Sequence, residues 1–191
     1  MKITKTDFDN LIVIESDYFK DDRGYFAETF RIDQLEDYLK MNINFVQDNE
    51  SCSKKNVLRG LHFQAPPFAQ SKLVRVLSGS VLDIVVDIRK GSKTYGQYLS
   101  FILSSENKKQ LFIPKGYAHG FLSLEDNTIF SYKVDNRYNA EHDYGINFAD
   151  SSIDINWHKN HEELIISEKD KSLPQLSDIP EIFNIEENYY E

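Results

Sequence analysis

Two histidines lie where a histidine side chain could transfer a proton. His62 lies in the run 58–64 (LRGLHFQ), and His119 follows a Pro/Gly turn in the run 114–120 (PKGYAHG). Histidine titrates near neutral pH, so either side chain could act as a base or an acid. A strand histidine is also often a packed or surface residue, so neither one is decisive alone. Alternation along 58–64 predicts that His62 and Arg59 face opposite sides of a strand.

The two histidines do not make a good metal site. Barrels that hold a metal often use a His-x-His pair, a Glu and a later His, but Gln64 occupies the third position of the pair and no Glu follows at a suitable distance. Two histidines without a carboxylate are a poor ligand set for first-row metals. The chain also lacks a Gly-x-Gly-x-x-Gly run that could hold a nicotinamide. We therefore expect no metal and no cofactor.

Basic side chains, a tyrosine and an acid add to the candidates. The basic residues within or beside the strand-rich part are Arg23, Arg59, Lys72 and Arg75. Arginine matches phosphate oxygens with two parallel hydrogen bonds, although any single surface arginine is more often simply solvated. Tyr132, in the run 130–134, would ordinarily pack with its hydroxyl at a rim. Asp170, in the run 166–170, would ordinarily be a surface acid.

Strands must position these residues, because the pattern from residue 45 to 134 is almost entirely β. Short apolar or alternating runs predict strands at 11–15, 24–30, 72–77, 80–87, 98–103, 110–113, 119–124 and 128–134. Ser78-Gly79 is a candidate for a two-residue hairpin turn. Strands of about six residues at even spacing are typical of a sandwich or a jelly-roll barrel, whose mouth can hold one small ligand.

Helices are few in this pattern. Residues 32–41 have the apolar spacing of one short amphipathic helix, and a second short helix is predicted near 162–168. The tail from about residue 157 is otherwise polar and irregular, and no pattern can be interpreted after Leu176. Without repeats or linkers, the sequence predicts a single, mainly β domain over residues 1–191.

Composition and charge exclude several classes of protein. The 191 residues include 31 acidic and 22 basic side chains, and the net charge of −9 argues against nucleic acid as a partner. A few arginines in a cleft could still attract a small anion. Cys52 is the single cysteine, so no intrachain disulfide can form. No apolar run could span a bilayer or serve as a signal peptide, so we expect a cytoplasmic protein with no membrane partner.

Taken in order, these motifs resemble the dTDP-4-dehydrorhamnose 3,5-epimerase family, also called RmlC-like. The resemblance rests on DRGYFAE at 22–28, QDNES at 47–51, VLRGLHFQ at 57–64, KLV at 72–74, GSVLDIVVDIR at 79–89, PKGYAHGF at 114–121 and ISEKD at 166–170, together with Tyr132 and Tyr138. It covers roughly residues 10 to 176.

The resemblance implies a cupin-like jelly-roll homodimer that needs no metal and binds a dTDP-linked 4-keto-6-deoxyhexose. By match to the family, His62 is the base, Asp170 pairs with it, and Tyr132 is the acid on the opposite face of the sugar. The matching substrate-binding residues are Arg23, Glu28, Gln47, Asn49, Arg59, Lys72, His119, Asp143 and Lys169, with Phe26 and Tyr138 against the thymine. A segment that crosses between subunits in the family would place Arg23, Phe26 and Glu28 in the partner's site.

The implied chemistry fits these residue types. Carbons 3 and 5 of the sugar flank the C4 ketone, so loss of either proton gives an enolate. Asp170 would orient the imidazole of His62, and Lys72 is the best candidate to stabilise the C4 oxygen. Inversion requires a second acid on the other face, which Tyr132 can supply. The implied reaction converts dTDP-4-dehydro-6-deoxy-D-glucose to dTDP-4-dehydro-L-rhamnose, on the route to bacterial surface polysaccharide.

One departure from the family and three alternatives stay open. Glu50 stands where the family commonly has His, and with Asp48 it adds negative charge beside Asn49. The first alternative is a mono-epimerase that acts at C3 or C5 of a related nucleotide-linked ketosugar. The second is a non-catalytic barrel that binds a sugar nucleotide. A metal-dependent cupin enzyme is the third, and it lacks ligands.

Overall fold

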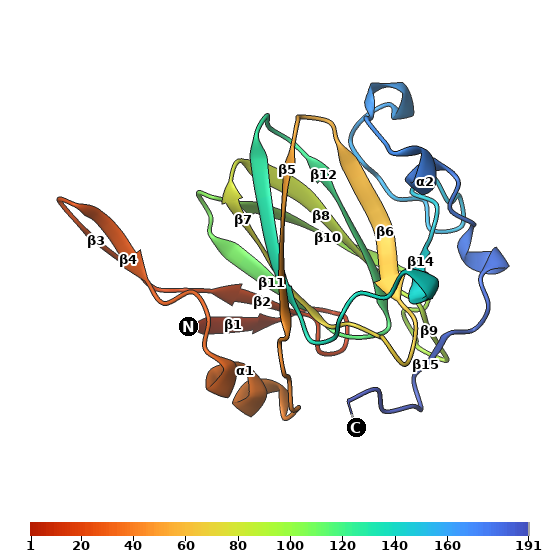
Figure 1. Cartoon of the computed structure of the whole chain (residues 1–191), viewed down its shortest axis with the longest axis horizontal. Coiled ribbons are helices and arrows are strands. Elements are labelled where there is room, and N and C mark those ends of the chain that lie inside the picture. Colours follow the sequence, from red (N-terminus) through yellow and green to blue (C-terminus); the bar gives the residue numbers. More distant parts are fainter. Residues whose placement is uncertain (191) are drawn as a thin grey trace.

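Two antiparallel sheets face each other in the structure, a computed structural model that describes residues 1–190 (Figure 1). The six-stranded sheet consists, in spatial order, of β1 (Lys2–Lys5), β2 (Ile12–Glu15), β11 (Lys109–Ile113), β7 (Lys72–Ser78), β13 (Thr128–Val134) and β5 (Gln47–Ser53). The five-stranded sheet consists of β10 (Tyr98–Ser104), β8 (Ser80–Asp87), β12 (Tyr117–Ser123), β6 (Leu58–Gln64) and β14 (Asp143–Gly145). The predicted mainly β, jelly-roll architecture is confirmed.

Several pairs of successive strands are divided between the two sheets. β7 belongs to the six-stranded sheet and β8 to the five-stranded sheet, and the pairs β10/β11 and β12/β13 are divided in the same way. The predicted hairpin at Ser78-Gly79 is therefore wrong, because Gly79 carries the chain from one sheet to the other. Its φ is 76°, and a Cβ at this position would lie 2.4 Å from the hydroxyl oxygen of Thr128. These crossings close the barrel.

Apolar side chains are buried on both faces of the central strand β8, in which all eight residues are buried. Val81 and Val85 belong to the cluster between the two sheets. Leu82 and Ile84 belong to a second cluster on the outer face of the sheet, where Trp157 also packs. Because side chains alternate along a strand, an odd-numbered residue of β8 points into the barrel.

Helix α1 (Ile32–Leu39) packs against the outer face of the six-stranded sheet (Figure 1). Its buried residues Leu35 and Leu39 lie in one cluster with Phe112 of β11. The helix ends at Lys40, whose φ of 56° is left-handed and whose N–H donates to the Glu36 carbonyl at 2.8 Å. The helix predicted over 32–41 is thus confirmed, with its end two residues earlier.

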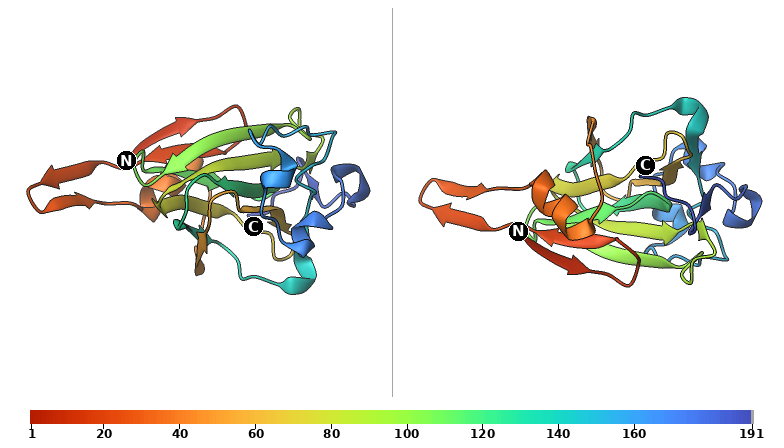
Figure 2. Two further views of the ribbon diagram at one scale, coloured as in Figure 1. Left: turned by 90° about the horizontal axis from the view of Figure 1, so that it is seen from above. Right: turned by 90° about the horizontal axis from the view of Figure 1, so that it is seen from below.

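The hairpin of β3 (Tyr18–Asp21) and β4 (Gly24–Ala27) projects away from the barrel in every view (Figures 1 and 2). The strand expected over 24–30 ends at Ala27, where the chain turns back toward α1. Two aromatic side chains of the hairpin are largely exposed, Phe19 at 65% and Phe26 at 71%. Phe19 and Phe26 are cross-strand partners, so they form one exposed apolar patch of the kind that interaction surfaces use.

The chain after β14 covers the outer face of the five-stranded sheet, and the helix predicted near 162–168 is wrong. A 3₁₀ turn at His161–Glu163 is followed by extended backbone and then by helix α2 (Glu168–Lys171). The backbone of Ile165 bonds instead to the start of β6, since its carbonyl accepts from Leu58 at 3.0 Å and its N–H donates to Asn56 at 2.8 Å. These long-range bonds replace the helical ones.

Short elements complete the described chain. They are 3₁₀ turns at Ala140–His142 and Leu176–Asp178, and the parallel pair β9 (Arg89–Lys90) and β15 (Phe183–Asn184). No helix within residues 1–190 is long and apolar enough to cross a membrane.

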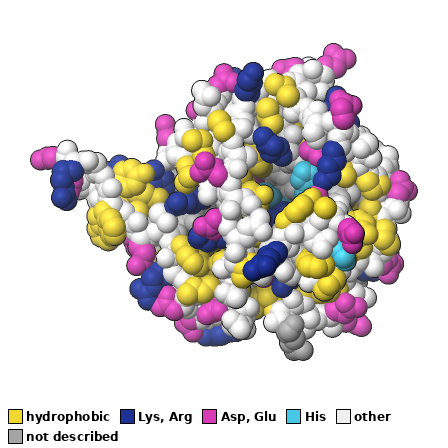
Figure 3. Space-filling view, viewed as in Figure 1, with side chains coloured by type: hydrophobic (Ala, Val, Ile, Leu, Met, Phe, Trp, Pro, Cys, Tyr) yellow, Lys and Arg dark blue, Asp and Glu magenta, His cyan; other side chains and the backbone are white. Residues whose placement is uncertain are grey.

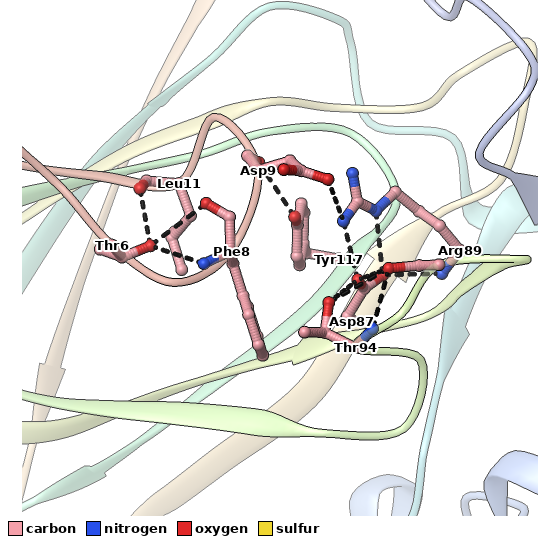
Figure 4. A network of polar contacts seen from close by, with 9 residues as sticks. Thr6, Phe8, Asp9, Leu11, Asp87, Arg89, Thr94 and Tyr117 are labelled. Atoms are coloured by element: carbon pink, nitrogen blue, oxygen red, sulfur yellow. Dashed lines mark hydrogen bonds and ion pairs between the residues drawn. The ribbon is translucent and has the colours of Figure 1, made fainter.

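A polar network ties the turn after β1 to the end of β8 (Figure 4). Buried Asp87 accepts hydrogen bonds from Arg89 Nε at 2.9 Å and from the Thr94 hydroxyl at 2.6 Å. The Arg89 guanidinium lies 4.4 Å from the centre of the Tyr117 ring and pairs with Asp9 at 3.6 Å. The Tyr117 hydroxyl donates to the Asp9 carbonyl at 2.9 Å. This network fixes the start of β12, the strand that carries His119.

Candidate active site

A cavity of about 630 Å³ opens between the two sheets. Figure 3 shows histidine side chains at the bottom of a hollow in this face, with lysine and arginine side chains around it. The predicted site residues that line the cavity are Arg59, His62, Lys72, His119, Tyr132, Lys169 and Asp170. The cavity therefore brings these polar side chains together with apolar ones such as Leu58, Phe121 and Phe130.

The imidazole of His62 is held by the carboxylate of Asp170. His62 Nε2 lies 2.8 Å from Asp170 Oδ1, and the other carboxylate oxygen accepts from the Gly60 N–H at 3.2 Å. Burial raises the pKa of Asp170, but the hydrogen bond and charge of His62 and the Gly60 bond outweigh it, so the pKa lies below its ordinary value. An ionised Asp170 orients the imidazole and stabilises its protonated form. The predicted pairing of these two residues is present in the geometry.

Helix α2 places Asp170 at this position. Ser167 caps the helix, and its hydroxyl oxygen accepts from the Asp170 N–H at 3.1 Å. Asp170 is 4% exposed, whereas the side chain of His62 is 32% exposed. The imidazole therefore reaches the cavity while its partner stays buried behind it.

A β-bulge puts Arg59 and His62 on the same side of β6, which contradicts the alternation expected from sequence. His119 pairs with His62 and Phe121 pairs with Arg59, so two residues of β6 oppose Gly120 alone. Gly60 has a φ of 125°, and a Cβ there would lie 2.5 Å from the Gly120 Cα. The extra residue reverses the alternation, and bulges commonly redirect side chains in this way next to active sites.

Lys72 enters the cavity from the six-stranded sheet. Its ammonium group donates to the His62 carbonyl at 3.2 Å. Burial lowers the pKa of Lys72 to about 8, although the charges of Asp143 and Asp83 act in the opposite direction. Lys72 is thus still protonated at neutral pH, beside the strand that carries His62. A cation there can stabilise an oxyanion that forms in the cavity.

Behind Lys72, His119 pairs with an acid that the sequence analysis missed. His119 Nε2 lies 2.9 Å from Asp83 Oδ2, and Asp83 is fully buried in the middle of β8. Asp83 Oδ1 has no hydrogen-bond partner among the described residues. Burial lowers the pKa of His119 and raises that of Asp83, each against the pull of the other. A carboxylate at an inward position of an otherwise apolar strand was the signal available in the sequence.

Tyr132 faces the cavity from β13, in the sheet opposite to that of His62. Burial raises the pKa of Tyr132 more than the charge of Arg59 lowers it, so its hydroxyl keeps its proton. Arg59 is held in place by the hydroxyl of Ser53, which accepts from its Nε at 3.2 Å. A neutral hydroxyl and a guanidinium group thus lie on one cavity.

Four further predicted residues lie beside the cavity and are linked to it through Lys169. Asp143 accepts from Lys169 Nζ and, at 3.1 Å, from the hydroxyl of Tyr138. The Tyr138 N–H donates to the Gln47 side chain at 3.3 Å, and Gln47 donates to Asn49 at 2.8 Å. The Tyr138 ring is 55% exposed. We call these four residues, together with Lys169, the rim cluster.

The three remaining predicted residues, Arg23, Phe26 and Glu28, are not brought to this cavity. Arg23 and Phe26 lie on the projecting hairpin, and Glu28 follows directly after it. Arg23 pairs with Asp21 of the same hairpin. Within one chain these residues are apart from the other predicted site residues.

The negative charges noted near Asn49 have different surroundings. Asp48 pairs with Lys133 at 2.9 Å, so its charge is offset by a lysine of the neighbouring strand. Glu50 lines the cavity. Within residues 1–190, no group of three or more His, Cys, Asp or Glu side chains could hold a metal ion.

These features define a class of protein, a proton-transfer enzyme on a jelly-roll barrel. The comparisons with known proteins agree. The family described as dTDP-4-dehydrorhamnose 3,5-epimerase matches residues 5–178. A dTDP-4-dehydrorhamnose 3,5-epimerase of Escherichia coli strain K12 is 46% identical over 179 residues, which cover 94% of this chain and 96% of the relative.

Solved structures are similar over nearly the whole chain. RmlC from Legionella pneumophila, in complex with dTDP-4-keto-L-rhamnose, has a TM-score of 0.91 and 42% identity over 96% of this chain and 97% of that one. A 3'-monoepimerase from Streptomyces bikiniensis, in complex with dTDP-quinovose, has a TM-score of 0.83 and 27% identity, and the match covers 88% of this chain and 84% of that one. The chain belongs to the dTDP-4-dehydrorhamnose 3,5-epimerase family, and it is an isomerase of the epimerase type.

Proposed function

We propose that this chain epimerises carbons 3 and 5 of dTDP-4-dehydro-6-deoxy-D-glucose and forms dTDP-4-dehydro-L-rhamnose. One observation carries the proposal: His62 and Tyr132 line the same cavity from opposite sheets. Inversion at carbon needs a proton removed from one face and returned to the other, and this arrangement provides a group on each side. The two cited relatives, which cover 94% and 96% of the chain, carry a 3,5-epimerase activity in their names.

The geometry of the site supports a role for each group in the proton transfers. Neutral His62 takes the proton from the carbon beside the ketone, and the C–H electrons move into an enolate whose negative charge lies on the C4 oxygen. Asp170 stabilises the imidazolium that forms. Protonated Lys72 stabilises the C4 oxygen. Tyr132 then donates its proton to the opposite face of the carbon and the carbonyl re-forms. Solvent protonates the tyrosinate and takes the proton from the His62 imidazolium, so that both groups return to their starting states.

The nucleotide part of the substrate would bind toward the outer side of the cavity. Arg59 and Lys169 line the cavity as cations, which suits the diphosphate. The exposed ring of Tyr138 in the rim cluster suits a flat pyrimidine. His119, Gln47, Asn49 and Asp143 provide further hydrogen-bonding groups. The reaction needs no cofactor, and its product would serve dTDP-L-rhamnose and polysaccharide synthesis in the cytoplasm.

A homodimer would complete the site. The hairpin and the residue directly after it carry three predicted substrate-binding residues away from the cavity of their own chain, and the hairpin side chains Phe19 and Phe26 are largely exposed. If the hairpin crosses to a second copy, Arg23, Phe26 and Glu28 reach the partner's cavity. Two copies related by a twofold axis would exchange hairpins reciprocally.

The experiment that tests the proposed function is NMR of dTDP-4-dehydro-6-deoxy-D-glucose in deuterated water with the purified chain. We expect deuterium at both C3 and C5 and accumulation of the L-rhamno product. Exchange at one carbon alone would make the chain a mono-epimerase, the activity named for the Streptomyces bikiniensis neighbour. Binding of the substrate without exchange at any pH would make it a non-catalytic sugar-nucleotide barrel.

A further inference from the structure

The segment 183–190, which we call the tail strap, crosses the end of the barrel nearest to Lys72. It begins with β15, where Phe183 is 2% exposed and packs edge-on against Phe63 of β6 at 6.0 Å between ring centres. Near its end, the Tyr190 hydroxyl is 2.8 Å from the hydroxyl of Ser71 and accepts from the Lys115 N–H at 3.0 Å. The strap is thus anchored to residues distant in the sequence.

The anchor is a closed polar cluster. Asp135 accepts from the Ser71 N–H at 2.6 Å and pairs with the Lys115 ammonium at 3.4 Å. The same ammonium donates to the Tyr189 carbonyl at 2.9 Å and lies 4.8 Å from the centre of the Tyr190 ring. Ser71 is fully buried. Burial raises the pKa of Tyr190 to about 12, so its hydroxyl stays neutral and hydrogen-bonded.

Each member of this cluster stands next to a strand of the active site. Ser71 directly precedes Lys72, and Asp135 directly follows β13, which carries Tyr132. Lys115 lies in the turn that leads into β12, which carries His119. One tyrosine hydroxyl therefore joins the start of β7 to the turn before β12, and Asp135 joins the end of β13 to both.

We propose that Tyr190 is a positioning residue for the active site: through Ser71 and Lys115 it fixes the place of Lys72 relative to the strands of Tyr132 and His119. The inference rests on the proposed function and adds a residue of the tail to it. Lys72 must stand beside the C4 oxygen when the enolate forms, and small displacements of a stabilising group cost rate more than binding.

The test compares Tyr190→Phe with Tyr189→Phe. Tyr190→Phe removes the hydroxyl that bonds to Ser71, whereas Tyr189→Phe removes a hydroxyl whose hydrogen bond from the Asn184 N–H stays within the strap. We expect Tyr190→Phe to lower kcat by roughly tenfold with little change in KM, because it displaces a group that acts in the transition state. Tyr189→Phe should keep the wild-type kcat.

A second readout separates positioning from general loss of stability. Loosening the start of β7 admits water to Lys72, so its pKa should rise from about 8 and the alkaline limb of kcat/KM should move to higher pH. Fewer folded molecules would lower the rate without moving that limb. The titratable groups that face Lys72, and must stay unchanged in both variants, are Asp83 of β8, His119 of β12, Asp143 of β14 and His62 of β6.

Ser71→Ala removes the other partner of the same hydrogen bond, so it should reproduce both the lower kcat and the shifted alkaline limb. It therefore tests the proposal even if Tyr190→Phe does not fold. The double variant should be no slower than Tyr190→Phe alone, because that change already breaks the hydrogen bond to Ser71 together with the one from the Lys115 N–H. Wild-type kcat and an unmoved limb in Tyr190→Phe, or an equal loss in Tyr189→Phe, would overturn the proposal. If the wild-type chain epimerises nothing, the proposed function fails, and the strap is then judged by the NMR titration of Lys72 in the same variants.

Discussion

Burial decides how the single residues of the cavity can act. Lys72 loses solvation inside the barrel, which brings its pKa close to physiological pH while the acids around it keep it protonated at pH 7. Burial raises the pKa of Tyr132 for the same physical reason, because it disfavours the charged form of any group. The two groups therefore stay in the states that stabilising an oxyanion and donating a proton require, a cation and a neutral acid.

The pH dependence of the rate follows from Lys72. A lysine whose pKa is lowered to about 8 is charged below that pH and neutral above it, so kcat/KM should fall as the pH rises through about 8. In Lys72→Arg the guanidinium stays charged, so this alkaline limb should disappear even if the rate is lower throughout. The measurement is kcat/KM from pH 6 to about pH 10 for both proteins. An alkaline limb at the same pH in Lys72→Arg would show that another group causes it.

At the scale of the elements, local sequence pattern predicts which residues form strands and helices, whereas long-range pairing decides which sheet each strand joins. The strands from residue 72 to 134 and the first helix were predictable, because their apolar spacing is local. The assignment of β7 and β8 to separate sheets was not, since it depends on pairing with strands distant in the sequence. The bulge at Gly60 was missed for the same reason, because it arises from the close approach of Gly120.

Much of the site was predictable by resemblance, whereas contacts outside the family motifs were not. The approach of Asp170 to His62 spans 108 positions and was expected from the resemblance alone, whereas that of Tyr190 to Ser71 spans 119 and no motif predicted it. No local pattern encodes such contacts. Asp83 was also missed, although a carboxylate in the middle of an apolar strand signals an inward polar partner.

The bulge in β6 gives a prediction for stability. In Gly60→Ala the added Cβ would lie 2.5 Å from the Gly120 Cα and 2.9 Å from the His119 carbonyl oxygen, at a φ of 125°. We expect a loss of about 2 kcal/mol or more in the free energy of unfolding, from clash and backbone strain together. Urea denaturation of Gly60→Ala and of the wild-type chain measures this difference in the free energy of unfolding.

Gly24→Ala is the matched control for that change. Gly24 has nearly the same φ, 126°, but a Cβ there would meet nothing within 4 Å. Gly24→Ala should therefore lower the free energy of unfolding only by the backbone strain, about 1 kcal/mol. Equal losses in the two variants would show that the close packing of Gly60 against Gly120 contributes nothing.

At the scale of the whole molecule, the hairpin stands apart from the barrel (Figure 2), and none of its residues lines the cavity of its own chain. Its three predicted substrate-binding residues serve the proposed reaction if two copies exchange hairpins. Such a site would draw His62 and Lys72 from one chain and Arg23 and Phe26 from the other. Activity would then belong to the assembly and not to the single chain.

Subunit complementation tests this arrangement. His62→Ala and Arg23→Ala should each be nearly inactive as pure proteins. After the two are unfolded and refolded together, random pairing should regenerate about one quarter of the sites intact, because each mixed dimer contains one unaltered cavity. Activity that never exceeds the mean of the two variants would place Arg23 in the cavity of its own chain or outside any site.

The base His62 is the centre of the whole account, and deuterium exchange at the sugar carbons tests it most directly. His62→Ala should fold and bind the dTDP-sugar, but incorporate no deuterium at C3 or C5 in deuterated water, because no group remains to take the proton. Tyr132→Phe, measured beside it, should still permit some exchange while inversion is strongly slowed. Exchange at the wild-type rate in His62→Ala would contradict the assignment of His62 as the base.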